Sequence, residues 1–78
     1  MLDKLDALKI LCVAAETLRL RETTLRFGIA PQIVTRGIAE LEKQLGEMLF
    51  QRNTHHMKLT PFGEQFWPQA EQLLADSD

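Results

Sequence analysis

Hydrophobic residues recur at helical spacing in several segments of the chain, most clearly between residues 31 and 45. The apolar residues of this segment are Val34, Ile38, Leu41 and Leu45. They are four, three and four positions apart, so they form one stripe along a helix. Pro31 suits the first helical position, and Gly46 can adopt the left-handed conformation that ends a helix.

The same spacing predicts two earlier helices, over residues 4–17 and 20–27. The apolar positions of the first, all expected in the core, are Leu5, Leu8, Leu11, Cys12, Ala15 and Leu18. In the second, Leu20, Thr24 and Phe27 are expected to face the core, and Gly28 ends the helix. Two helices joined by a short turn that contains glycine form the helix-turn-helix pattern.

After Gly46 the periodicity changes from helical to alternating. Residues 49–52 are a candidate strand, and Met57, Lys58 and Leu59 alternate as apolar, charged and apolar in a second one. The polar residues 53–56 join the two strands as a hairpin. A hairpin after a helix-turn-helix is a wing, which commonly lies along the DNA backbone or in the minor groove.

A fourth helix is predicted from Pro61 onward, with Thr60 as its N-cap. Pro68 removes one backbone hydrogen bond inside this helix and is expected to kink it. Its apolar positions are Phe62, Phe66, Trp67, Ala70, Leu73 and Leu74. This stripe is wider than so small a domain needs, which favours a dimerisation surface. The alternative is that the stripe only packs on the first helix.

Charge is distributed unevenly along the chain. The formal net charge of −2 argues mildly against nucleic-acid binding, because many DNA-binding modules are basic. Four arginines, Arg19, Arg21, Arg26 and Arg36, nevertheless occur between residues 19 and 36, where Glu22 is the single acid. A basic face is therefore expected on an otherwise acidic protein.

Length and composition indicate one small globular domain. The chain has 78 residues and 45% hydrophobic content, enough for a modest core. Its single cysteine, Cys12, fits a reducing cytoplasm and is expected to be a packing residue. No apolar run is long enough to span a membrane, and no signal peptide is evident. Because the chain ends inside a helical pattern, a longer protein is expected.

Hydrogen-bonding side chains gather on the polar face of the 31–45 helix, near its start. Arg36 can donate to a guanine edge or a phosphate, Gln32 can read adenine, and Thr35 can bond a phosphate or touch a thymine methyl. Ile33 offers apolar contact only. This face is typical of a helix that enters the DNA major groove. The alternative from these residues alone is an ordinary solvent-facing helix.

Three motifs in order resemble the N-terminal DNA-binding domain of LysR-type transcriptional regulators. They are Thr35-Arg36-x-Ile38-x-x-Leu41-Glu42-x-x-Leu45-Gly46, Leu49-Phe50-x-Arg52 and Leu59-Thr60-x-x-Gly63. The resemblance covers nearly the whole chain. It implies a mainly α winged helix-turn-helix over residues 1–60, with a three-helix core and a two-stranded wing. Residues 61–78 would begin a linker helix that pairs two subunits.

The resemblance also implies partners and site residues. Such regulators bind double-stranded DNA as homodimers or tetramers and respond to a small effector through a C-terminal domain that this chain lacks. The residues expected to contact DNA are Arg21, Pro31, Gln32, Ile33, Thr35, Arg36, Arg52, His55, His56 and Lys58. The dimer contacts are expected from the apolar stripe of the fourth helix.

Several positions depart from the family pattern. Arg19 and Ala30 stand where a capping side chain is usual, and Gly37 lies inside the third helix at a cost of up to about 1 kcal/mol relative to alanine. Two threonines, Thr23 and Thr24, replace the usual alanines. These changes favour weakened DNA binding. An alternative function is therefore a winged-helix dimerisation module that interacts with a full-length regulator.

Other chemistry finds little support in the sequence. His55 and His56 have no nearby cysteine or third ligand, so no metal site is expected. If both histidines were protonated on a phosphate, DNA affinity would instead rise as the pH falls. No catalytic triad, phosphate loop or carboxylate pair is recognisable, so we expect neither an enzyme nor a cofactor.

Overall fold

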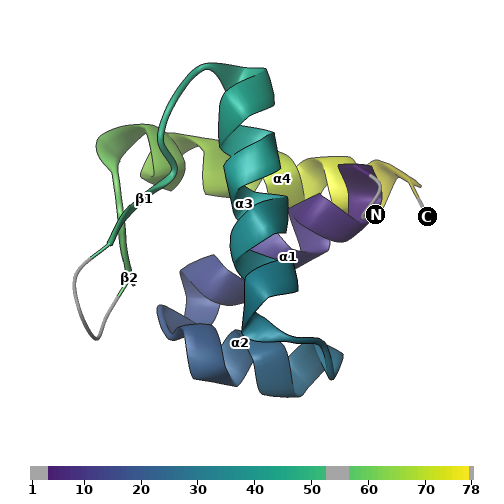
Figure 1. The fold of residues 1–78 in the computed structure, drawn as a ribbon. Helices are drawn as coiled ribbons and strands as arrows, with labels where there is room; N and C mark the ends of the chain where they lie inside the picture. Colours follow the sequence, from purple (N-terminus) through teal and green to yellow (C-terminus); the bar gives the residue numbers. More distant parts are fainter. Residues whose placement is uncertain (1–3, 53–56, 78) are drawn as a thin grey trace.

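The computed structural model describes residues 4–52 and 57–77, which form four helices and one pair of antiparallel strands (Figure 1). In order they are α1 (Lys4–Thr17), α2 (Leu20–Phe27), α3 (Pro31–Leu45), β1 (Phe50–Arg52), β2 (Met57–Leu59) and α4 (Pro61–Ser77). This architecture confirms the expected winged helix-turn-helix with an additional helix.

Two glycines end helices as the sequence predicts. Gly28 and Gly46 follow α2 and α3 with φ values of 65° and 73°, in the left-handed region. Each donates its backbone N–H to a carbonyl of the last turn, that of Thr24 or Glu42. Leu18 adopts the same conformation after α1, with φ 57°, and turns the chain sharply into α2.

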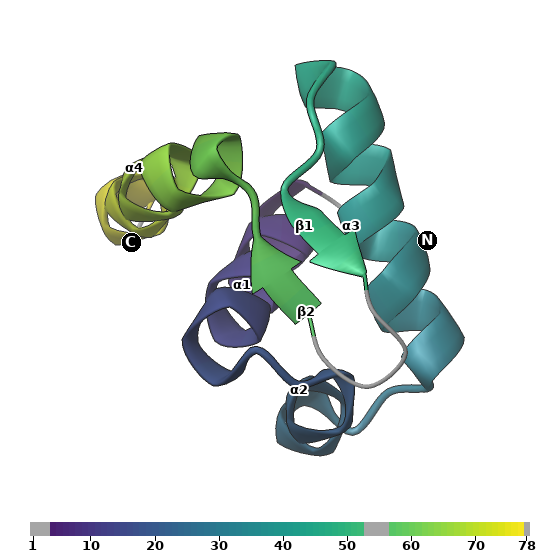
Figure 2. The same cartoon turned by 90° about the vertical axis from the view of Figure 1, so that its left-hand side faces the viewer.

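The core is centred on α1, which packs against α2, α3 and α4. In Figure 1, α3 stands in front, α1 and α4 lie behind it, and α2 crosses below. Figure 2 shows the two strands between α3 and α4. The buried apolar residues are Ala7, Leu8, Ile10, Leu11, Ala14, Ala15, Val34, Ile38, Leu41, Leu49, Phe50 and Ala70. Because α4 contributes Ala70, it shares the core of the first three helices.

The prediction of the core is wrong at three positions, which are exposed or half-buried. Leu5 is 43% exposed, and Leu18 lies beyond the end of α1 on the surface, because the buried face of α1 is centred on Ile10, Leu11 and Ala14. In α2 the fully buried threonine is Thr23, and Thr24 is only half-buried. The Thr23 hydroxyl donates to the carbonyl of Arg19 at 3.0 Å, which compensates its burial.

The strands pair in a short, regular register. Phe50 is opposite Leu59, Gln51 opposite Lys58 and Arg52 opposite Met57. The first strand begins one residue later than expected, because the N–H of Leu49 bonds to the side chain of Glu42 rather than to β2. Among the described residues, no helix combines the length and apolar character needed to cross a membrane.

Candidate nucleic-acid interface

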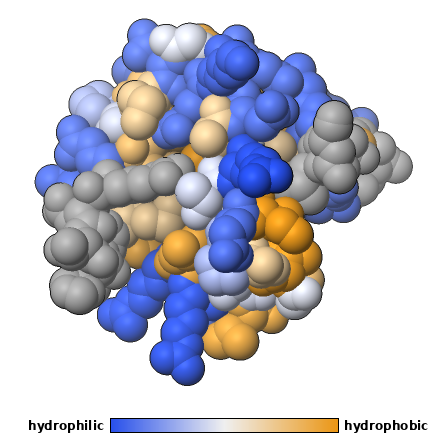
Figure 3. Space-filling model, in the orientation of Figure 1, coloured by the Kyte–Doolittle hydropathy of each residue, from blue (hydrophilic) through white to orange (hydrophobic). Residues whose placement is uncertain are grey.

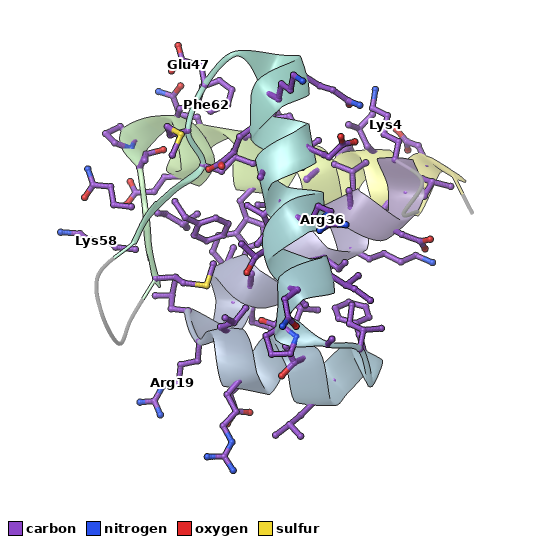
Figure 4. All side chains as sticks on the ribbon, in the orientation of Figure 1. Lys4, Arg19, Arg36, Glu47, Lys58 and Phe62 are labelled. Carbon is purple, nitrogen blue, oxygen red and sulfur yellow. The ribbon has the colours of Figure 1, made fainter. Side chains whose placement is uncertain are left out.

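The first half of α3 presents the side chains that the sequence singles out. Pro31, Gln32 and Arg36 are exposed, Ile33 is 43% exposed, and Thr35 is half-buried. The opposite side of the helix carries the buried residues Val34, Gly37, Ile38, Leu41 and Glu42. The helix is therefore held from behind, and its polar face remains accessible (Figure 4).

The donors on this face have no partner within the described chain. The side chains of Gln32, Thr35 and Arg36 make no hydrogen bond or ion pair with any residue of the described ranges. In Figure 4, Arg36 lies on the side of α3 that is turned away from α1 and α4. These groups can bond another molecule without first breaking a hydrogen bond or ion pair to residues 4–52 or 57–77.

The start of α3 lacks a side-chain cap, as the sequence predicts. Ala30 precedes Pro31 and supplies only its carbonyl oxygen, which accepts from Ile33 N at 3.0 Å and Val34 N at 3.3 Å. No described group accepts the N–H of Gln32. An open helix start of this kind carries partial positive charge and favours a nearby anion.

Exposed basic side chains continue from α3 onto neighbouring elements. Arg21 and Arg26 lie on α2, Arg19 precedes it, and Lys58 lies on β2. Arg19 and Lys58 extend from the same side of the molecule, below and beside the wing (Figure 4), where Figure 3 shows hydrophilic groups protruding. Exposed cations are thus present on α2, on α3 and on β2, the elements from which a basic face is expected.

The second half of α3 has the opposite charge character. Glu40 is exposed one turn beyond Arg36, and Glu47 is exposed after the helix, at the far end from Arg19 (Figure 4). Lys43 is the single exposed cation among residues 39–47. The exposed charge thus changes from positive at Arg36 to a net negative value over residues 39–47.

Three expected contacts of the wing cannot be placed. His55 and His56 lie outside the described residues, and for Arg52 only the backbone, at the end of β1, is described. The proposed contacts at these positions remain predictions. Lys58, in the middle of β2, is exposed as expected.

The structure identifies a residue that sequence reasoning missed, Glu42. Its side chain is 8% exposed, and Oε2 accepts from Leu49 N at 2.7 Å and from Phe50 N at 3.2 Å. The signal for it was its position beside the apolar stripe, between Leu41 and Leu45. A carboxylate there is buried and must receive hydrogen bonds from elsewhere in the chain.

The apolar stripe of α4 divides into buried and accessible positions. Ala70 is fully buried within the chain, so it has no surface left for a second subunit. Leu73 is 48% exposed. The half-buried residues are Phe62, Phe66, Trp67 and Leu74, which pack at the edge of the core. The stripe thus contacts α1 and leaves part of its surface open.

The described residues give little support for a reactive cysteine or a metal site. Burial raises the pKa of the Cys12 thiol to about 11, with further contributions from the negative charges of Glu71 and Glu16, so it stays protonated at neutral pH. Among the described residues, no group of three or more His, Cys, Asp or Glu side chains is arranged to hold a metal ion.

Comparisons with known proteins agree with this geometry. The sequence profile described as "Bacterial regulatory helix-turn-helix protein, lysR family" matches residues 5–64. The HTH-type transcriptional regulator EstR of Acinetobacter baylyi is 38% identical over 76 residues, which are 97% of this chain and 25% of that protein. The chain spans a quarter or less of the curated relatives that it matches first.

Two crystal structures that contain DNA are similar in fold. A CbnR_DBD–DNA complex superimposes with a TM-score of 0.92 at 25% identity, over 96% of this chain and 86% of that one. A complex of BenM_DBD with catB site 1 DNA gives a TM-score of 0.88 at 29% identity, over 97% of this chain and 85% of that one.

Proposed function

Because the chain belongs to the lysR family of bacterial regulatory helix-turn-helix proteins, we propose that it is the sequence-specific DNA-binding part of a transcriptional regulator. The first half of α3 enters the major groove of double-stranded DNA, and the wing lies along the backbone or in the minor groove. In this arrangement residues 1–60 read DNA, and residues 61–78 begin the linker helix.

One observation carries this proposal: the polar face at the start of α3 is accessible, and its side chains have no hydrogen-bond or ion-pair partner in the part of the chain that the structure describes. Arg36 can donate two parallel hydrogen bonds to a guanine, and Gln32 can do the same to an adenine. Thr35 and the free N–H of Gln32 suit phosphate oxygens, and the exposed Ile33 suits a thymine methyl. Arg21 and Lys58 neutralise phosphates at the edges of this contact.

The remaining features of the proposed regulator are inferred from the resemblance to LysR-type regulators and from the accessible part of α4. Two copies pair through the accessible part of the α4 stripe, and a full-length protein forms tetramers in the bacterial cytoplasm. A small effector acts through a C-terminal domain outside this sequence. We propose no catalytic activity and no cofactor, since the relatives carry names of transcriptional regulators.

Selection of bound sites from random duplex DNA tests the proposal directly. We expect a motif with two-fold symmetry, because a symmetric dimer binds two half-sites. Recovery of no enriched sequence, together with no binding to any duplex at low salt, contradicts it.

A pair of matched substitutions locates the contact on α3. Arg36→Ala is expected to weaken binding to the selected site by about 1–3 kcal/mol, since it removes a direct donor to a base or phosphate. Lys43→Ala removes the same charge from the second half of the helix and should change the affinity by less than about twofold. Fluorescence anisotropy at several salt concentrations measures both. Equal losses for the two variants would place the contact elsewhere.

The missing caps favour one alternative function. Neither Arg19 nor Ala30 supplies a side-chain hydrogen bond to the helix that it precedes. In this alternative the chain binds no DNA and only pairs with a full-length regulator. Dimerisation without DNA binding at low salt is its expected outcome, which the same experiments distinguish from the first proposal.

A further inference from the structure

The start of the wing is attached to α3 through a single carboxylate oxygen. Oε2 of Glu42 accepts from the backbone N–H groups of both Leu49 and Phe50, at 2.7 and 3.2 Å. Glu42 is 8% exposed, so water does not readily replace it. Removal of this acceptor would leave two buried N–H groups without a partner.

The carbonyl groups of the same segment bond to the start of α4. The Thr60 hydroxyl donates to Met48 O at 2.6 Å, and Thr60 N donates to Leu49 O at 3.0 Å. The hydroxyl oxygen in turn accepts from Gly63 N at 3.0 Å. The N–H groups of Leu49 and Phe50 are therefore bonded to α3, and the carbonyls of Met48 and Leu49 are bonded to Thr60, directly before α4.

The wing itself is too small to fix its own position. Each strand has three residues, and an isolated two-stranded hairpin is marginally stable in water. Outside the hairpin, β2 has one further backbone tie, from Met57 N to Leu18 O at 3.3 Å. Met57 and Leu59 also pack against the core, and at the start of the wing Glu42 supplies the two hydrogen bonds that come from α3.

We propose that Glu42 is a positioning residue for DNA binding, which sets the wing at a fixed place relative to the reading half of α3. This inference rests on the proposed function. Glu42 lies on the same rigid helix as Arg36, six residues further along, and faces the core while Arg36 faces out. One helix therefore fixes the separation between the groove contact and the backbone contact of the wing.

The test separates positioning from general stability by double-mutant cycles. Affinity for a labelled mixed-sequence duplex is measured over a series of salt concentrations for Glu42→Ala and Glu42→Gln, each alone and combined with Lys58→Ala or Arg36→Ala. In wild type, Lys58→Ala should lower the salt slope of binding by about 1. In the Glu42→Ala background it should change the slope by less, because the wing is no longer held at a fixed distance from the DNA backbone. Arg36→Ala should cost the same factor in both backgrounds.

The conservative variant and a charge control complete the design. Glu42→Gln keeps an acceptor oxygen, so the effect of Lys58→Ala should return to near its wild-type size. Glu40→Ala removes an exposed carboxylate two residues away and should leave both cycles unchanged. An undiminished effect of Lys58→Ala in the Glu42→Ala background would overturn the inference, and so would a loss of the Arg36→Ala effect there.

A measurement without DNA keeps the two proposals distinguishable. Hydrogen exchange at the amides of Leu49 and Phe50 should accelerate tenfold or more in Glu42→Ala relative to core amides of α1, and much less in Glu42→Gln. Unchanged protection at these amides contradicts the attachment of the wing by Glu42, whatever the DNA result. Absence of wild-type binding to any duplex would instead overturn the proposed function, and with it the role of Glu42 in DNA binding.

Discussion

The helices α3 and α4 both begin at a proline, yet their first turns are completed differently. Before Pro31, the methyl group of Ala30 offers no acceptor, and Ile33 N turns back to the Ala30 carbonyl at 3.0 Å. Before Pro61, the Thr60 hydroxyl accepts the equivalent N–H, that of Gly63, also at 3.0 Å. The start of α3 is exposed, whereas Thr60 and Gly63 are buried.

This difference follows from the surroundings of the two helix starts. At α4 the cap has to be supplied by the chain, because the site is enclosed by Met48, Leu49 and Leu59 and buried donors need partners. At α3 solvent reaches the open turn, and in our proposal a DNA phosphate does so too. A helix start without a side-chain cap is therefore tolerated where water or another molecule can reach its N–H groups.

Among the substitutions at the two helix starts, Gly63→Ala should lower the stability of the protein most. A Cβ atom at position 63 would overlap the backbone oxygen of Leu49 and lie 2.9 Å from Cδ2 of Leu59. Helix propensity alone favours alanine by about 1 kcal/mol, but overpacking against a backbone group costs about 1–3 kcal/mol or more. We expect a net loss of about 2 kcal/mol in the free energy of unfolding, measured by urea denaturation. Glu64→Ala, at an exposed neighbour, should be nearly neutral; a more stable Gly63→Ala protein would contradict the close packing.

Thr60→Val should have the next largest effect. Valine keeps the shape of threonine but removes the hydroxyl, which leaves Gly63 N and Met48 O without this partner. The loss of a cap costs about 0.5–2 kcal/mol, so we expect about 1.5 kcal/mol by the same denaturation measurement. Thr60→Ser keeps the hydroxyl and should restore most of the stability. A serine variant as unstable as the valine variant would assign the effect to packing rather than to the cap.

Ala30→Ser should have the smallest effect on stability, and it tests whether the start of α3 lacks a cap. A serine hydroxyl can accept the N–H at the start of α3, and we expect a gain of about 1 kcal/mol in unfolding free energy. Ala39→Ser makes the same change at an exposed position inside the helix, where serine is slightly unfavourable. Thermal denaturation of the two variants should therefore shift in opposite directions. Shifts of the same sign would show that the start of α3 does not lack a cap.

Much of the fold follows from local signals in the sequence. Glycine at 28 and 46 and proline at 31 and 61 fix helix ends through backbone conformations that these residues favour, and the structure places the ends there. The spacing of apolar residues also identifies the buried side of α3. Such signals depend on near neighbours, so they can be recognised without knowing how the chain folds back.

What the sequence does not reveal depends on contacts between distant segments. The burial of Thr23 rather than Thr24 is set by how α2 lies on α1. The role of Glu42 likewise depends on the N–H groups seven and eight residues later, which the fold brings to its carboxylate. At the candidate interface, periodicity predicts the exposed face of α3, whereas which residues of α4 are buried depends on its packing on α1.

The bonds from Glu42 to Leu49 and Phe50 also constrain how this sequence can change in length. The carboxylate reaches only one pair of amides, so the segment 46–48 that connects α3 to the strand acts as a spacer of fixed size. Insertion or deletion of a residue there would bring the wrong amides to the carboxylate and reverse the inward and outward sides of β1. Homologous chains that keep a glutamate at this position should therefore tolerate substitutions in the connection far better than gaps.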